Sequence, residues 1–153
     1  MFKYIHNAIL TASILILTAT SVFSVAKGPI GVLEGAIFPV VDPALTIISY
    51  ENLGGGETKL AGYAGKVRNC NYILDSLEWY YGTEERNVGV SAYFEDPPAI
   101  NSVGQLEWKA IIVGLSEKRI RENSYATVKH DCGFPWLTTS LFYISENGAS
   151  NGR

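Results

Sequence analysis

Hydrophobic and polar residues alternate along much of the chain after residue 43, and this pattern predicts β-strands. The clearest alternation runs from Asn87 to Glu95, where every second residue is apolar: Val88, Val90, Ala92 and Phe94. Strict alternation is typical of a strand with one buried face and one face in water. Less regular patterns predict further strands over residues 44–50, 66–81, 106–113, 125–132 and 136–144, the second with a bulge near Asp75 and Ser76.

Turn-forming residues separate these segments and indicate the fold class. Three consecutive glycines, Gly54 to Gly56, predict a loop, and Pro97 and Pro98 end the preceding strand because proline has no backbone N–H to donate. Residues 116–123 are polar and predict one helical turn with Ser116 as its cap. Six or so short strands joined without long helices predict an all-β, mainly antiparallel fold, a small β-sandwich over residues 44–144.

Two segments without a strand pattern flank this region. Residues 27–43 contain Gly28, Pro29 and Pro39 among several apolar residues, so we expect an irregular lead-in that packs against the domain. Residues 145–153 are small and polar, and we expect a disordered tail. A chain of 153 residues has room for one domain between these segments.

The first 26 residues have the pattern of a secretory signal peptide. Lys3 is the only charged side chain before Lys27, and the centre of the segment, residues 14–17, is strongly apolar. Small residues stand at Ser24 and Ala26, the positions where the peptidase accepts an extended chain with little room for side chains. We therefore expect cleavage after Ala26 and an extracytoplasmic domain, either secreted or periplasmic.

An uncleaved membrane anchor is the competing interpretation of the same segment. Residues 8–26 carry no charge over 19 positions, close to the roughly 20 that a helix needs to cross a bilayer. Hydroxyl residues interrupt this run and shorten its most apolar part, which favours cleavage: Thr11, Ser13, Thr18, Thr20, Ser21 and Ser24. Either interpretation carries the rest of the chain across a membrane.

The charge of the chain argues against nucleic-acid binding. The formal net charge is −3, and it becomes −4 without residues 1–26 because only Lys3 is lost. The one basic cluster, residues 118–121, is flanked by Glu117 and Glu122. A mildly acidic domain of this kind lacks the positive stripe that a phosphate backbone requires.

Cys70 and Cys132 are the only cysteines, and both lie in the exported part. In an oxidising compartment two cysteines of a small domain usually pair, so we predict a disulfide that closes a loop of about 60 residues. One cysteine on an early strand, one on a late strand and Trp79 shortly after the first give a layout similar to an immunoglobulin-like sandwich. That resemblance implies a tyrosine two residues before the second cysteine, where this chain has His130.

His130 offers an alternative chemistry for the same cysteines. It is the only histidine left after cleavage, and on a strand it faces the same side as Cys132, which would suit a nucleophile and its base. A thiol nucleophile has to stay reduced, so the oxidising compartment favours the disulfide. Without a short-spaced ligand pair, these residues do not predict a metal site, and no phosphate-binding cofactor motif occurs.

Carboxylates provide a second route to catalysis. Glu78, Glu95 and Asp96 could form an acid–base pair of the kind that glycosidases use. A domain of this size offers several such pairs by chance, so we predict no catalytic residue.

Aromatic residues are the stronger indication of function. Tyr81, Tyr93 and Trp136 lie on predicted strands where their rings can face solvent. Exposed rings bury much area at little entropic cost, which suits the recognition of a protein or carbohydrate partner. We expect Trp79 and Trp108 to fill the core instead.

Three hypotheses for the function follow from these patterns. The first is a non-enzymatic binding module at the cell envelope or in a secreted assembly, held together by its disulfide. The second is a small secreted hydrolase that uses His130 or a carboxylate pair. The third is a structural subunit of an extracellular or viral assembly.

Overall fold

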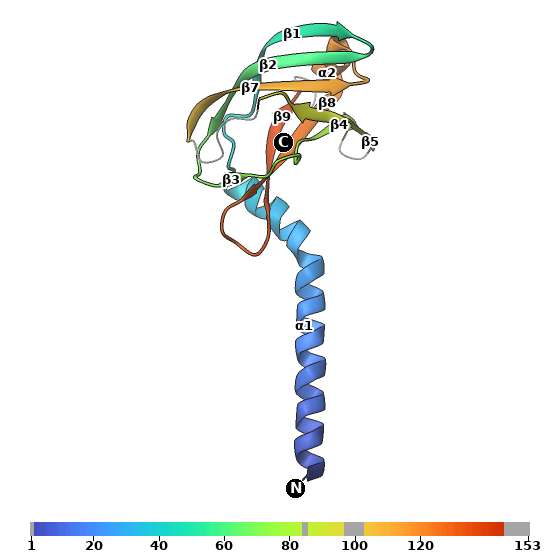
Figure 1. The fold of residues 1–153 in the computed structure, drawn as a ribbon, viewed down its shortest axis with the longest axis vertical. Helices are drawn as coiled ribbons and strands as arrows, with labels where there is room; N and C mark the ends of the chain where they lie inside the picture. Colours follow the sequence, from blue (N-terminus) through green and yellow to red (C-terminus); the bar gives the residue numbers. More distant parts are fainter. Residues whose placement is uncertain (1, 84–85, 97–102, 146–153) are drawn as a thin grey trace.

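A computed structural model of the chain describes residues 2–83, 86–96 and 103–145. One long helix, α1 (Phe2–Ile37), leads into a body built of β-strands (Figure 1). The N-terminal part of α1 projects away from this body, whereas its last turns lie against it (Figure 1). The protein is therefore mostly β, with a long helix at its N-terminus that begins in the segment predicted to be a signal peptide or an anchor.

Two antiparallel sheets form the body. The first has the strand order β1-β2-β7-β6, with the bounds Thr46–Gly54, Glu57–Lys66, Gly104–Val113 and Ala92–Phe94. The second has the order β3-β8-β4-β5, with the bounds Asn71–Tyr72, Ser124–Asp131, Glu78–Thr83 and Arg86–Val90. In the second sheet β8 also pairs with β9 (Thr138–Ile144), and a short helix, α2 (Glu117–Asn123), joins β7 to β8. The predicted antiparallel pairing is confirmed.

Side chains from both sheets share one core. Trp108 of β7 contacts Phe142 of β9 with ring centroids 5.0 Å apart, and Phe94 of β6 contacts the same ring at 5.3 Å. Trp79 and Trp108 are 1% and 2% exposed, which confirms their predicted place in the core. Burial of such large rings is a main source of stability in a domain of this size.

β2 has no counterpart among the predicted strands. Its residues alternate between buried and more exposed positions, as in any half-buried strand. The inward positions, however, include Gly62, Ala64 and Lys66, so the apolar signal along the segment is weak. The predicted loop at Gly54 to Gly56 is the turn that joins β1 to β2, and all three glycines have positive φ there.

The clearest predicted strand is divided between the two sheets. β5 pairs with β4 in the second sheet and β6 pairs with β7 in the first, so the chain changes sheets at Ser91. Val88 is 67% exposed, whereas Phe94 packs against the core. The prediction of a single buried face over residues 87–95 is therefore wrong at Val88, because a strand that changes sheets does not keep one face inward.

The predicted strand over residues 66–81 is also divided. β3 and β4 are separated by a turn in which Asp75 has a positive φ of 59°. Such a conformation is uncommon outside glycine, although aspartate tolerates it better than most residues. The predicted bulge near Asp75 and Ser76 marks this break.

Residues 27–37 are helical, which corrects the irregular lead-in predicted for residues 27–43. Pro29 lies inside α1 and does not end it. The helical turns after Pro29 pack against the β-body, and these contacts outweigh the tendency of proline to break the helix. The segment from Phe38 to Leu45 lacks helix, and its buried residues pack against the domain as expected: Val40, Val41 and Leu45.

The helical turn expected over residues 116–123 is α2, and Ser116 precedes it without a side-chain capping bond.

The predicted C-terminal tail is partly covered by the structure. Ser145, the first residue of the predicted tail, is buried and donates its backbone N–H to Ser124 at 2.9 Å, so the tail prediction is wrong at this position. Residues 146–153 lie outside the described part of the chain.

Candidate functional site

The helix α1 has an exposed N-terminal part and a docked C-terminal part. All side chains from Ile9 to Val25 are exposed. The helix meets the body at Gly31 and Gly35, which lie about one turn apart on the same face. A methyl group at Gly31 would overlap the carbonyl oxygen of Leu137, and one at Gly35 would overlap that of Thr139. These two glycines therefore let the helix lie directly on backbone.

Glu34 fixes the docked part of α1 through three side-chain hydrogen bonds. Its carboxylate accepts bonds from Arg68 at 2.8 Å, from Nε1 of Trp136 at 3.0 Å and from Oγ1 of Thr138 at 2.6 Å. Arg68 also donates to the carbonyl oxygen of Phe38 at 2.6 Å. The Glu34 side chain is 14% exposed, so charge-assisted bonds of this kind compensate for the loss of water around it. No sequence pattern identifies Glu34, because its partners are up to 104 residues away.

A groove lies between the docked helix and the loop that joins β8 to β9. It has a volume of about 420 Å³, and Lys27 and Gly28 line it on the helix side. Phe134 and Trp136 line it on the loop side, with their rings stacked at a centroid distance of 5.3 Å and an angle of 4°. The groove is thus bounded by an aromatic pair and by the point where the uncharged part of α1 ends.

One segment of α1 has the length and composition of a membrane-spanning helix. Within the described residues, Ile9–Ile37 is the segment long and apolar enough to cross a bilayer. The hydroxyl groups along it are bonded to the helix itself: Ser13, Thr18, Thr20, Ser21 and Ser24 each donate to the carbonyl oxygen four residues earlier, at 2.8 to 3.0 Å. Bonds of this kind reduce the cost of placing a hydroxyl group in lipid.

Cys70 and Cys132 form a disulfide, with their Cα atoms 4.5 Å apart. The bond connects the segment before β3 with the end of β8, close to the docked end of α1: Oγ1 of Thr138, which donates its hydrogen to Glu34, lies 3.4 Å from Sγ of Cys132. The predicted pairing is confirmed, and neither cysteine remains a free thiol.

His130 lies in the core and not at a surface where a substrate could reach it. It is 0% exposed, and neither ring nitrogen has a hydrogen-bond partner among the described residues. Burial, assisted by the positive charges of Lys66 and Arg68, lowers the pKa of His130 to about 4. Lys66 is itself 2% exposed, and burial lowers its pKa as well. A neutral, enclosed imidazole of this kind does not suit a general base.

The candidate carboxylates are paired with lysines and not with each other. Glu78 accepts hydrogen bonds from Lys129 and from the hydroxyl group of Tyr80. Burial would raise the pKa of Glu78, but these bonds outweigh it and lower the pKa. Glu95 forms a 2.7 Å ion pair with Lys59. The lowered pKa of Glu78 is the opposite of what a general acid needs, and the ion pair holds Glu95 beside a lysine and not beside a second carboxylate.

The three predicted binding residues have different neighbours. Tyr81, on β4, packs partly against the core, with Arg119 5.7 Å from the centre of its ring. Tyr93, on β6 in the other sheet, is 43% exposed. Trp136 lies beside α1 and is bonded to Glu34. The structure therefore brings Trp136, but not the two tyrosines, to the groove beside the helix.

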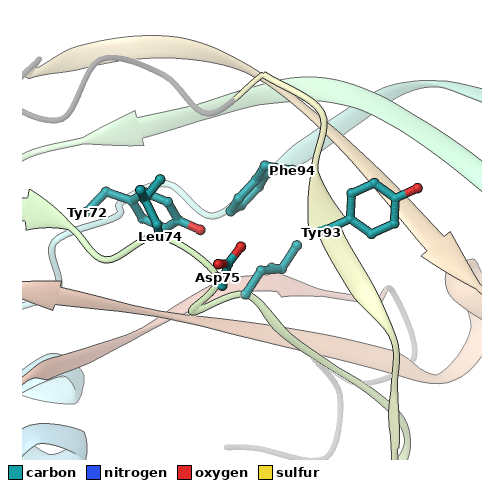
Figure 2. Close-up of a pocket in the computed structure, with 6 residues that line it drawn as sticks. Tyr72, Leu74, Asp75, Tyr93 and Phe94 are labelled. Carbon is teal, nitrogen blue, oxygen red and sulfur yellow. The ribbon is translucent and has the colours of Figure 1, made fainter.

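A small hollow lies beside Tyr93 (Figure 2). Tyr72, Asp75 and Phe94 contribute to its walls, and the ring of Tyr93 points away from Tyr72 (Figure 2). Its volume of about 40 Å³ suits water, whereas ligand pockets usually measure several hundred Å³. Burial raises the pKa of Tyr72 to about 12, so its hydroxyl group stays protonated at neutral pH.

Neither a metal centre nor a relative gives further guidance. In the part of the chain that the structure describes, no group of three or more His, Cys, Asp or Glu side chains could hold a metal ion. Comparison with known proteins finds no family model, curated protein or solved structure that matches this chain.

Proposed function

We propose that this protein is a membrane-tethered extracytoplasmic binding module, in which α1 is retained as the anchor and the two sheets form a small β-sandwich. The observation that carries the proposal is the continuity of α1. The helix runs without a break from the exposed apolar segment into the turns that Gly31, Glu34 and Gly35 fasten to the β-body.

This continuity favours an anchor over a cleaved signal peptide. Signal peptidase binds the residues before the cut in an extended conformation, whereas Ser24 to Ala26 are helical and lie within two turns of the docked Gly31. The hydroxyl residues that interrupt the apolar run are largely bonded within the helix. The uncharged run from residue 8 to residue 26 rises about 28 Å as a helix, close to the thickness of the hydrocarbon layer.

The disulfide supports an orientation in which the β-body lies outside the cytoplasm. A bond between Cys70 and Cys132 forms and persists where the environment is oxidising. Lys3 would then lie on the cytoplasmic side of the membrane and Lys27 on the outer side; with one lysine at each end, the orientation rests on the disulfide.

The side chains of the β-body suit binding better than catalysis. The hydrolase hypothesis relies on His130, which is enclosed, or on carboxylates that are neutralised by Lys59 and Lys129. Tyr93 is a large exposed ring and is available to a protein or carbohydrate partner. We propose that the anchor holds this surface close to the membrane.

The test is to express the full chain with its native N-terminus and wash the membranes at alkaline pH. We expect the protein in the washed membrane pellet, and intact-mass analysis should give the whole chain of 16.7 kDa, less two hydrogens for the disulfide. A soluble product that begins at Lys27 would show that the segment is a cleaved signal peptide and would refute the anchor. A matched variant, Leu17→Arg, places a charge in the apolar run and should reduce retention in the pellet.

A further inference from the structure

The loop between β8 and β9, residues 132–137, extends along the same end of the β-body from which α1 emerges (Figure 1). The contacts of this loop show which turns of α1 it lies beside. Leu137 and Trp136 lie against Gly31, because a methyl group there would reach the Leu137 carbonyl and come within 3.8 Å of the Trp136 ring. Phe134 lines the groove together with Lys27 and Gly28. The loop therefore lies beside the first turns after the uncharged run.

This position corresponds to the headgroup layer of a bilayer. Gly31 is five residues beyond Ala26, which is about 7 Å along a helix axis. The hydrocarbon layer is about 30 Å thick and the whole bilayer about 40–45 Å, so each headgroup layer measures roughly 5–8 Å. If the uncharged run fills the hydrocarbon layer, the loop that contacts Lys27 to Gly31 lies in the adjoining headgroup layer.

The side chains of the loop fit that environment. Phe134 is 48% exposed and stacks on Trp136, whose Nε1 is bonded to Glu34. Tryptophan is enriched at membrane interfaces because its ring is apolar and its N–H is polar. Lys27 lines the same groove and can approach lipid phosphates, although Asp131 in the groove weakens this attraction and Lys129 is already paired with Glu78. The aromatic pair is therefore the main feature that suits lipid.

Apolar surface continues from the helix onto this end of the body. Val32, Leu33 and Ile37 in the docked turns of α1 are exposed, as are Phe38 and Leu137. Val32, Leu33 and Ile37 belong to the same helix as the membrane-spanning segment and follow it after Lys27, Gly28 and Pro29. Exposed apolar residues so close to the segment that lies in lipid favour lipid over a separate protein partner as the occupant.

We propose that the β8–β9 loop is a membrane-contact site, with Phe134 and Trp136 in the headgroup layer of the bilayer that α1 spans. The inference rests on the proposed function, because it requires α1 to remain in the membrane. The loop and α1 then hold the β-body at two points, and this limits how far the body can tilt relative to the membrane.

The experiment compares two variants of the full chain that differ in where one tryptophan stands. Both carry Trp136→Phe; one adds Phe134→Trp in the loop and the other adds Leu53→Trp in β1, which Figure 1 places at the end of the body away from α1. Each protein is reconstituted into vesicles of phosphatidylcholine and phosphatidylglycerol that contain a lipid with a nitroxide on its headgroup. Trp79 and Trp108 are buried in both proteins and contribute the same background.

We expect the nitroxide to quench the loop tryptophan at least about twofold more than the β1 tryptophan. Flotation of the vesicles on a density gradient reports the anchor separately. If both proteins float and the two tryptophans are quenched equally, the loop lies outside the lipid and the inference is overturned while the anchor stands. If neither protein floats, the anchor fails and the inference fails with it.

Discussion

Glu34 and Trp136 are joined by a 3.0 Å hydrogen bond across 102 positions of the chain. Glu34 belongs to α1 and Trp136 to the β8–β9 loop, so this bond links the proposed anchor to the body that it carries. Thr138 and Arg68 donate to the same carboxylate. A single acidic side chain thus fixes how the helix meets the sheet.

Replacing Glu34 with alanine should release the docked turns of α1. Three donors would lose their acceptor together, and we expect the free energy of unfolding to fall by roughly 2–3 kcal/mol. Urea unfolding of the full chain in detergent, followed by circular dichroism, measures this loss. The matched control is Glu122→Ala in α2, where the partner Lys118 is 80% exposed; that change should cost less than about 0.5 kcal/mol. Equal losses in the two variants would contradict the role of Glu34.

Replacing Gly31 or Gly35 with alanine should move α1 off the body. The new methyl group would meet backbone carbonyl oxygens that belong to the β8–β9 loop and β9 and cannot easily shift. We expect each change to cost about 1–3 kcal/mol in the same urea titration, and to make the segment after Ile37 more susceptible to protease. Gly28→Ala is the matched control, because nothing lies within 4 Å of a methyl group there. A harmless Gly35→Ala would show that the helix does not pack on backbone as described.

The strands and the disulfide could be predicted from the sequence because their signals are local or come from a single pair of residues. Alternation marks β8, an apolar run marks β7, and two cysteines have one way to pair. β2 could not be predicted, because Gly62 and Ala64 carry little apolar signal at its inward positions. It is held in the sheet by pairing with β1 and with β7, and β7 is too remote in the sequence to contribute to a local pattern.

The junction between α1 and the body could not be predicted for a related reason. Pro29 and the glycines of residues 27–43 predict a break when they are considered alone. The structure uses Gly31 and Gly35 for close packing instead, and Glu34 finds partners in β9, the β8–β9 loop and the segment before β3. Only the spacing of two glycines one turn apart, with an acid between them, could have suggested a helix face that packs closely.

Tyr81 and Tyr93 should respond differently to replacement with alanine. Tyr81 packs partly against the core and lies next to Arg119, so we expect Tyr81→Ala to lower the free energy of unfolding by about 1–2 kcal/mol. Tyr93 is 43% exposed, so Tyr93→Ala should leave it within about 1 kcal/mol of the wild-type value. Thermal melting of the two variants checks this order. A binding defect in Tyr93→Ala would then report recognition, whereas one in Tyr81→Ala would not separate recognition from folding.

Reduction of the disulfide should destabilise the body considerably. The bond between Cys70 and Cys132 spans 62 positions, and the chain-entropy relation gives a crosslink of that length about 4 kcal/mol. We expect the urea midpoint to fall when a phosphine reductant is added. The Cys70→Ala, Cys132→Ala double variant should show the lower midpoint with or without reductant. A wild-type midpoint that does not respond to complete reduction would contradict this estimate.

His130 should make the stability of the protein depend on pH below neutrality. Its pKa is about 4 in the folded protein and about 6.5 in the unfolded chain, so between these values the unfolded chain binds the extra proton. Stability is therefore complete above pH 6.5 and falls as the pH decreases through 4, by roughly 3 kcal/mol for this one group. The matched variant is His130→Phe, which keeps an aromatic ring beside Tyr72 and cannot take up a proton. Carboxylates such as Glu78, whose pKa is lowered by Lys129, destabilise both proteins equally in acid, so the difference between the two titrations isolates the histidine. Urea unfolding at intervals between pH 7.5 and pH 4 measures the free energy of unfolding of both proteins. We expect it to fall faster with decreasing pH in the wild type than in the variant. Parallel pH profiles would mean that His130 takes up a proton in the folded protein as readily as in the unfolded chain.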